Sequence, residues 1–153
     1  MTLPNDMPRR CGECGEKIFK RRNLNGSVSM PWRDFPIAYV TKDLELWTCE
    51  NCGNYVITAG DAEKIDAAVE ASIRDQTSQF IDIIKSKSGK SLEELSAIIG
   101  ISPQYLSNIR NEKRTPSFHL WNLLKIIAIC PKDLIQKMDP SLDIRKENLL
   151  LRA

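Results

Sequence analysis

A five-residue pattern, Cys-x-x-Cys-Gly, occurs twice in this 153-residue chain, at 11–15 and again at 49–53. Each copy places two thiols on one tight turn, and its glycine permits the positive φ that such a turn requires. Two turns of this kind supply four thiolates, which is the tetrahedral ligand set of a structural zinc site. The repeat therefore predicts one structural zinc ion per chain, bound by cysteines from two distant places: Cys11, Cys14, Cys49 and Cys52.

A closed set of four thiolates argues against catalysis, because a catalytic zinc keeps one coordination position open for water. The single histidine, His119, lies near the start of an apolar helical pattern, with no nucleophile or paired acid beside it. Cys130 has no cysteine nearby in the sequence, and a free cysteine is usually a small buried hydrophobe, so we exclude it from the metal site. We expect that the protein is not an enzyme.

The segment between the two cysteine pairs has the pattern of short strands. Residues 37–40 and 44–48 predict a hairpin around 41–43 that delivers the second cysteine pair, and 55–57 predict a third strand. The predicted zinc module, residues 1–58, is too small to bury a large apolar core, so the metal must supply much of its stability. In zinc-finger peptides the binding free energy of the ion is about 10–16 kcal/mol. The basic residues near the first pair suit either nucleic-acid contact or screening of thiolate charge: Arg9, Arg10, Lys17, Lys20, Arg21 and Arg22.

The segment 91–116 predicts two short helices joined by a tight turn. Ser91 and Glu94 have the spacing of a capping box, which starts the first helix. Gly100 suits the left-handed conformation that ends it. Ser102 then caps a second helix whose first position is Pro103, where a missing N–H costs nothing. Two short helices with this connection form a helix-turn-helix.

The outer face of the second helix carries side-chain amides at helical spacing. Gln104 and Asn108 are four residues apart and lie on one stripe, where carboxamides can match the major-groove edge of adenine. Lys113 and Arg114 follow and can hold phosphates. The alternative is a helical bundle whose polar face is merely solvated, and periodicity alone does not decide between the two. The candidate DNA contacts are Ser102, Gln104, Tyr105, Ser107, Asn108, Lys113 and Arg114.

The chain order predicts an α+β fold class: a small β-rich zinc module followed by an all-α, five-helix domain, whose helix-turn-helix resembles that of lambda-repressor-like domains. We expect a zinc-binding domain at 1–58, a connecting helix and hinge at 59–76, the helix-turn-helix domain at 77–140 and a tail at 141–153. The hinge falls at 75–78, and the acidic face of the connecting helix is expected to be solvated. Further helices are predicted after Ser117 and from Pro131.

Charge and hydropathy limit the kinds of partner. No apolar run is long enough to span a membrane, and the first residues have no secretory signal, so a cytoplasmic location is expected. The formal charge of +2 falls to zero if four thiolates bind one zinc ion. Attraction to DNA must therefore come from local basic patches.

The segment 91–116 resembles the XRE-type helix-turn-helix family, whose pattern is met by Leu95-Ser96, Gly100-Ile101-Ser102, Leu106-Ser107-Asn108-Ile109 and Lys113-Arg114-Thr115-Pro116. That family usually has glycine after its second helix, where this chain has Asn111-Glu112; asparagine tolerates the left-handed conformation better than most residues.

Together with the four cysteines, the order of modules resembles the MqsA-type antitoxins. The resemblance implies a transcriptional repressor that forms a homodimer, binds a palindromic operator in double-stranded DNA through Gln104 and Asn108, and binds a toxin protein through its zinc domain. Two alternatives remain open: a zinc-containing regulator that acts alone, and a protein- or RNA-interaction adaptor without a toxin.

Overall fold

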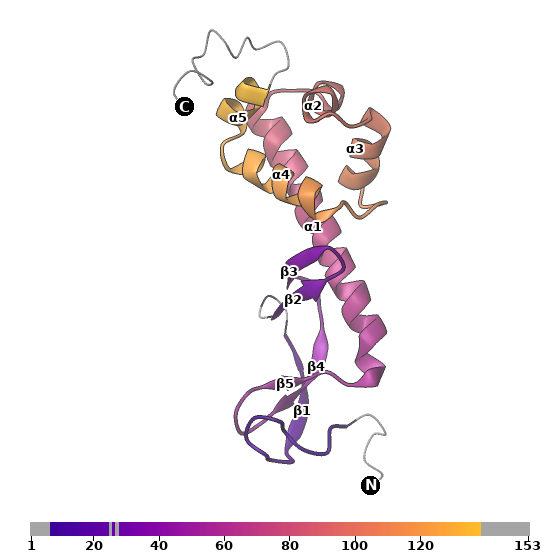
Figure 1. Cartoon of the computed structure of the whole chain (residues 1–153), viewed down its shortest axis with the longest axis vertical. Coiled ribbons are helices and arrows are strands. Elements are labelled where there is room, and N and C mark those ends of the chain that lie inside the picture. Colours follow the sequence, from indigo (N-terminus) through magenta and orange to yellow (C-terminus); the bar gives the residue numbers. More distant parts are fainter. Residues whose placement is uncertain (1–6, 25, 27, 139–153) are drawn as a thin grey trace. The chain divides into compact units, whose positions relative to one another are not determined.

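The chain divides into two compact units, Met1–Ile73 and Arg74–Ala153, in this computed structural model, which describes residues 7–24, 26 and 28–138. The expected fold class is confirmed: a small β-rich region with a cysteine cluster precedes an all-α region. The predicted tail at 141–153 lies outside the described residues. Figure 1 shows the order of the elements along the chain.

Unit 1 contains a three-stranded antiparallel sheet, and its middle strand ends at Cys49, the first residue of the second cysteine pair. Its strands are β1 (Phe19–Asn23), β4 (Glu45–Cys49) and β5 (Tyr55–Val56), in the order β1-β4-β5. Cys49 is the last residue of β4 and pairs with Phe19, the first residue of β1. The short strand expected at 55–57 is confirmed, whereas β1 was not anticipated.

A separate two-stranded sheet is formed by β2 (Val28–Trp32) and β3 (Phe35–Val40), with a bulge between Met30 and Trp32. The predicted hairpin between 37–40 and 44–48 is therefore wrong, because those segments pair in different sheets. No strand was predicted at 28–32, a segment that contains Pro31, which has no backbone donor for a sheet. The link at 41–43 is instead held by helix α1, where the Ser72 hydroxyl accepts from the backbone N–H groups of Thr41 (2.9 Å) and Lys42 (3.1 Å).

Helix α1 (Ala62–Ser88) follows a 3-10 turn, η1 (Ala59–Asp61), and is 27 residues long. The sequence predicts a break between two helices at 75–78, but these residues are helical and lie within α1. Asp75-Gln76-Thr77-Ser78 contains no glycine or proline, and weak local propensity yields to tertiary contacts. Thr77 is fully buried, and the Ser78 hydroxyl donates to the carbonyl of Arg110 at 2.7 Å.

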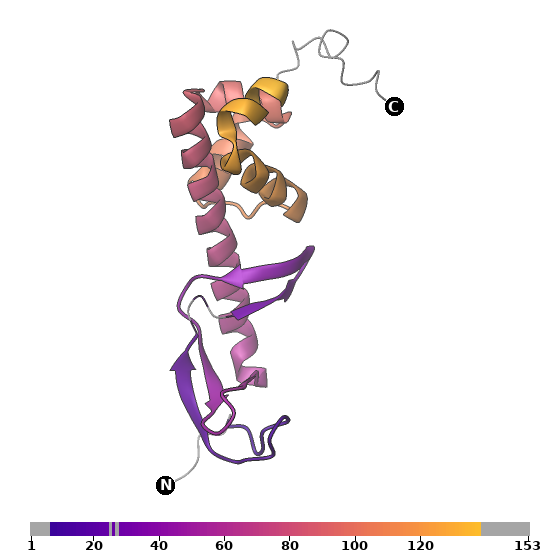
Figure 2. The ribbon, with the colours of Figure 1, turned by 90° about the vertical axis from the view of Figure 1, so that its left-hand side faces the viewer.

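Unit 1 also uses the first half of α1, which Figure 2 shows beside the two sheets. The acidic residues of the predicted connecting helix were expected to be solvated, but Asp61 in η1 and Asp66 and Glu70 in α1 make contacts within unit 1. Trp32 Nε1 donates to Asp66 at 2.6 Å, and the Arg33 guanidinium lies 3.7 Å from both Asp66 and Glu70. Asp61 is buried and pairs with Arg21 at 2.7 Å. These bonds hold the β2–β3 turn to α1, and β1 to η1.

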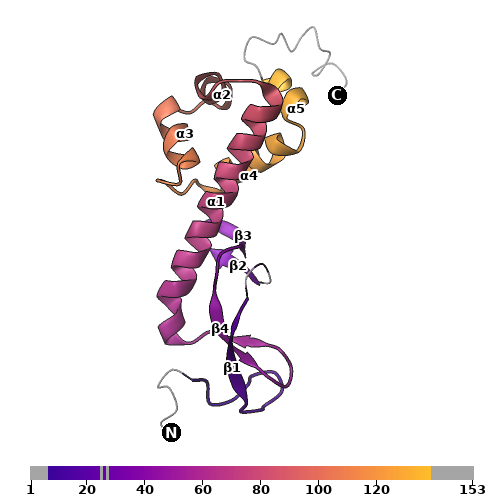
Figure 3. The same cartoon turned by 180° about the vertical axis from the view of Figure 1, so that it is seen from behind.

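Unit 2 is built on the second half of α1, with α2 (Leu92–Ile99) and α3 (Pro103–Arg110) on one side of it and α4 (Phe118–Ile129) and α5 (Pro131–Met138) on the other, as Figures 1 and 3 show. The five expected helices of this region are confirmed, although the first begins at Ala62. The buried core is one cluster: Ile81, Ile84, Leu95, Leu106, Ile109, Leu124, Ile127 and Ile135.

The capping residues of unit 2 act as the sequence predicts. Ser91 and Glu94 form the capping box, and Ser102 and Ser117 cap α3 and α4. Gly100 ends α2 with a φ of 81°. Cys130, which was expected to be buried, is exposed, because it lies at the C-terminal cap of α4 before Pro131 opens α5.

Candidate metal centre and nucleic-acid interface

The two Cys-x-x-Cys-Gly turns have the same backbone geometry. Gly15 N–H donates to the Cys11 carbonyl at 3.0 Å, and Gly53 N–H donates to the Cys49 carbonyl at 2.9 Å. The two glycines have φ values of 77° and 75°, so the conformation expected from the motif is confirmed. A side chain at either position would be strained, because L-residues rarely adopt this region. The sequence repeat is thus also a structural repeat.

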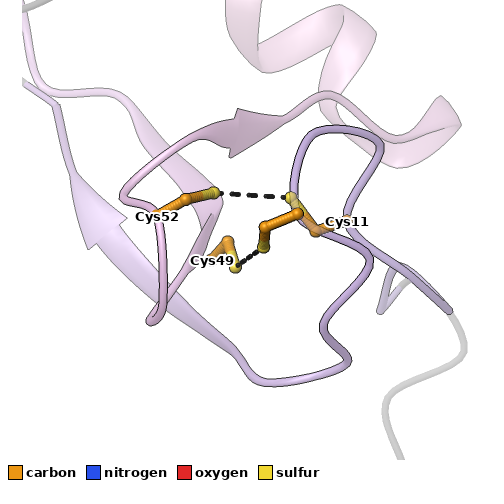
Figure 4. Close-up of side chains that lie close together, drawn as sticks. Cys11, Cys49 and Cys52 are labelled. Atoms are coloured by element: carbon orange, nitrogen blue, oxygen red, sulfur yellow. Dashed lines mark hydrogen bonds between the residues drawn. The ribbon is translucent and has the colours of Figure 1, made fainter.

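The four sulfur atoms meet at one place, although their turns are far apart in the sequence. All lie within 4.8 Å of one another. Two close contacts join opposite turns, with the Cys11 sulfur 3.6 Å from that of Cys52 and the Cys14 sulfur 3.5 Å from that of Cys49. Figure 4 shows Cys11, Cys49 and Cys52 directed toward a common point. These distances exceed a disulfide bond of about 2 Å and approach the roughly 3.8 Å between sulfurs around a tetrahedral zinc ion.

Within each turn the first cysteine is buried and the second is exposed, and the two exposed thiols differ in pKa. Cys11 and Cys49 are buried, whereas Cys14 and Cys52 are exposed. The backbone N–H of Glu16, helped by the Asn51 side chain, lowers the pKa of Cys14 to about 6. The Asn54 backbone N–H favours the Cys52 thiolate, but desolvation and three neighbouring sulfurs prevail and raise the pKa of Cys52 to about 12. Binding of a dication must displace protons from this cluster.

The four cysteines are therefore positioned to bind a metal ion, and the all-sulfur donor set suits zinc. When bound, the ion would cross-link the turn before β1 to the turn after β4. Two of the basic residues near this site have structural contacts. Arg10 Nε donates to the Gly15 carbonyl at 2.9 Å, and the Arg21 guanidinium lies 4.8 Å from the centre of the Trp47 ring.

Helix α3 presents the predicted amide pair on its outer side. Leu106 and Ile109 are fully buried, which fixes the opposite face toward solvent. Gln104 is exposed and Asn108 is partly buried, and Gln104 Nε2 donates to Asn108 Oδ1 at 3.2 Å. Ser102 is exposed but accepts from the Tyr105 backbone N–H at 3.2 Å, so it serves first as the helix cap.

The remaining predicted DNA contacts lie on α3 or just after it. Tyr105 packs against the core cluster of unit 2, and Lys113 and Arg114 are exposed in the loop that follows α3. Asn111, which was not among the predicted contacts, is exposed, and its Nδ2 donates to Ser107 Oγ at 3.4 Å. Ser107 and Asn111 have the same spacing of four residues as Gln104 and Asn108.

The end of α3 has a Schellman motif with an unusual residue in its left-handed position. Lys113 N–H donates to the Asn108 carbonyl at 2.8 Å, and Glu112 N–H donates to the Ile109 carbonyl at 3.0 Å. Glu112 has a φ of 57°, whereas Asn111 has a φ of −87°. The left-handed residue is therefore Glu112 and not Asn111, because helical geometry continues through Asn111 and places Glu112 directly after the cap.

A family model described as Helix-turn-helix matches residues 82–125, from the second half of α1 to the middle of α4. The chain carries a helix-turn-helix domain. The XRE-type resemblance is confirmed for this domain, which supports a DNA-binding transcriptional regulator. No curated protein matches the chain. Among the described residues, no helix combines the length and apolar character needed to cross a membrane.

Proposed function

We propose that the protein is a sequence-specific transcriptional repressor that binds a palindromic operator as a homodimer. The observation that carries this proposal is the solvent-facing Gln104–Asn108 pair on the second helix of the helix-turn-helix domain. In such domains the N-terminal part of this helix enters the major groove, and dimers meet half-sites about one helical turn apart. Gln104 lies in the first turn of α3, where a side chain can reach base edges.

The bond between the two amides favours a division of roles. Gln104 donates to Asn108 Oδ1, which keeps a second lone pair, while Asn108 Nδ2 remains a donor. Asn108 can then accept from N6 and donate to N7 of adenine. Gln104 restrains the orientation of the Asn108 side chain, and the carboxamide oxygen of Gln104 can accept a hydrogen bond from a neighbouring base. Lys113 and Arg114 would hold phosphates, which supply affinity without sequence information.

We further propose that unit 1 is a zinc-stabilised platform for a partner protein, which makes the repressor an antitoxin. A four-thiolate site is closed to substrate, so the zinc would have a structural role. Unit 1 presents large apolar side chains to solvent that its own core does not use: Ile18, Ile37, Tyr39 and Ile57 are each more than half exposed. The resemblance to MqsA-type antitoxins identifies the expected partner as a toxin.

The test of sequence reading uses the full-length, zinc-loaded protein and an operator selected from a pool of random duplexes. Gln104→Ala and Asn108→Ala should each cost about 1–3 kcal/mol on that operator and relax base preference at one position per half-site. Binding to random DNA should change little. Gln136→Ala, an exposed glutamine on α5, is the matched control. Equal losses on operator and random DNA would show that these residues do not read sequence.

The partner proposal is tested separately with the protein encoded by the adjacent reading frame. Calorimetry should detect binding to the wild type and a clear loss of affinity for the Ile37→Asp and Tyr39→Asp variants, whose substitutions lie on the exposed face of β3. Operator binding by both variants should remain. No binding to the wild type would leave a regulator that acts without this partner and would refute the antitoxin assignment.

A further inference from the structure

A polar stripe on α1 holds the C-terminal end of α3. Arg74, Ser78 and Asp82 are spaced by four residues and therefore lie on one side of the helix. Asp82 Oδ1 accepts from Arg110 Nε at 2.8 Å, and Ser78 Oγ donates to the Arg110 carbonyl at 2.7 Å. That carbonyl is one of the last four of α3, and such carbonyls receive no hydrogen bond from a backbone N–H of their own helix. The stripe thus supplies a donor that the helix lacks.

Arg74 extends the stripe to the loop after α3. Its Nε donates to Thr115 Oγ1 at 2.8 Å, and its Nη1 lies 3.4 Å from the Glu112 carbonyl. One guanidinium therefore reaches both ends of the segment that contains Lys113 and Arg114. Because a guanidinium is planar and its donors are fixed, two such contacts define the position of the loop better than one ammonium can.

This loop needs external support because its backbone is strained. Glu112 has a φ of 57°, a conformation that costs a residue with a Cβ roughly 1–2 kcal/mol. Lys113 and Arg114 follow directly and are exposed, so the direction in which they leave the loop depends on the conformation of Glu112. The Arg74 guanidinium holds the residue before Lys113 and Arg114, through the Glu112 carbonyl, and the residue after them, through the Thr115 hydroxyl.

We infer that Arg74 and Ser78 are positioning residues for DNA binding, which hold Lys113 and Arg114 in the geometry that contacts phosphates. The inference rests on the proposed function. Both residues precede the segment that matches the helix-turn-helix family, which begins at residue 82. The DNA-binding element of this chain therefore starts at Arg74 or earlier, and α1 contributes to it along a longer stretch than the family match covers.

The experiment measures binding of the full-length protein to a fluorescein-labelled random-sequence duplex, because phosphate contacts require no operator. Arg74→Met should weaken binding about fivefold, which corresponds to about 1 kcal/mol. Thr115→Val, which keeps the shape but removes the acceptor, should reproduce part of this loss. Lys87→Met removes the same charge from an exposed position of α1 and should change affinity less than about twofold.

A double-mutant cycle separates positioning from other roles. In a Lys113→Ala/Arg114→Ala background, Arg74→Met should have almost no further effect, since the groups that it positions are gone. Thermal unfolding is followed in parallel, and affinities are compared where every variant is folded. If Arg74→Met does not fold, Thr115→Val and Ser78→Ala are tested in the same cycle.

Three outcomes would overturn the inference, and they are distinguishable. If Arg74→Met weakens binding equally in both backgrounds and Thr115→Val has no effect, Arg74 contacts phosphate itself. If Arg74→Met and Ser78→Ala lower the unfolding temperature but leave affinity unchanged, the stripe has only a structural role. If the wild type binds no duplex, the proposed DNA-binding function fails as well.

Discussion

The two units of this chain achieve stability by different means. In unit 2, four helices and the second half of α1 place eight buried apolar side chains in one cluster. In unit 1, the buried side chains are divided among a three-stranded sheet, a two-stranded sheet and the first half of α1, and two of them are cysteines of the metal site. A region with a continuous core can rely on apolar burial alone, whereas a region divided between two sheets needs cross-links.

Metal removal should have the largest effect and should affect the two units unequally. Chelation, or Cys49→Ser, removes a contribution of about 10–16 kcal/mol in comparable zinc modules, so β1, β4 and β5 should lose hydrogen-exchange protection. The helices α2 to α5 should remain protected. Zinc content is measured alongside, with Cys130→Ser as the control that retains one ion per chain. Loss of protection in α2 to α5 would contradict the independence of the two cores.

A smaller effect is expected at Asp61, the buried acid of unit 1. Its carboxylate is fully buried and accepts from the Thr58 backbone N–H, the Thr58 hydroxyl and Arg21 Nη1, at distances of 3.0, 2.7 and 2.7 Å. Asp61→Asn should destabilise unit 1 by about 2–4 kcal/mol, because Arg21 loses the partner of a buried ion pair. Denaturant unfolding measures the loss. Asp133→Asn, which breaks an exposed pair with Lys137, should cost about 0.5 kcal/mol at most.

The same carboxylate predicts a pH dependence. Burial alone would raise the pKa of Asp61, but hydrogen bonds from Thr58 and the charge of Arg21 prevail and hold this pKa below its ordinary value of 3.8. A lowered folded-state pKa contributes stability above the unfolded-state value, and this contribution disappears as the pH falls through the folded-state value. The difference in stability between wild type and Asp61→Asn should therefore shrink below about pH 4. A constant difference would exclude this linkage.

The smallest predicted effect is a gain in unit 2. Glu112→Gly relieves the left-handed strain at the end of α3 and should stabilise the protein by about 0.5–1 kcal/mol, after the entropic cost of glycine is counted. It also removes a negative charge beside Lys113 and Arg114, so affinity for random DNA should rise. Glu112→Gln separates the two effects, because it removes the charge but keeps the strain. Equal stability gains for both variants would show that charge, not conformation, is responsible.

The sequence by itself determined the features that depend on a few neighbouring residues. The capping box of Ser91 and Glu94, the caps at Ser102 and Ser117 and the stop at Gly100 were all predicted, because each is a bond or a φ value within one helical turn. The cysteine turns were predicted for the same reason. That the two turns lie close together was also predictable, because four thiolates form the tetrahedral ligand set of one structural zinc ion.

Only the tertiary structure decided which distant segments pair. The strand at 35–40 pairs with 28–32 and not with 45–49. The Ser72 hydroxyl holds the link at 41–43, which separates 35–40 from 45–49, and Pro31 is tolerated because a two-stranded sheet has only edge strands. Helix α1 continues through 75–78 because Thr77 is buried and Ser78 bonds to Arg110. The left-handed residue after α3 is Glu112, which Arg74 approaches from 38 positions earlier in the chain. Local sequence patterns do not predict such contacts, because the contacts join residues far apart in the sequence and stabilise the chain only when those segments are packed together.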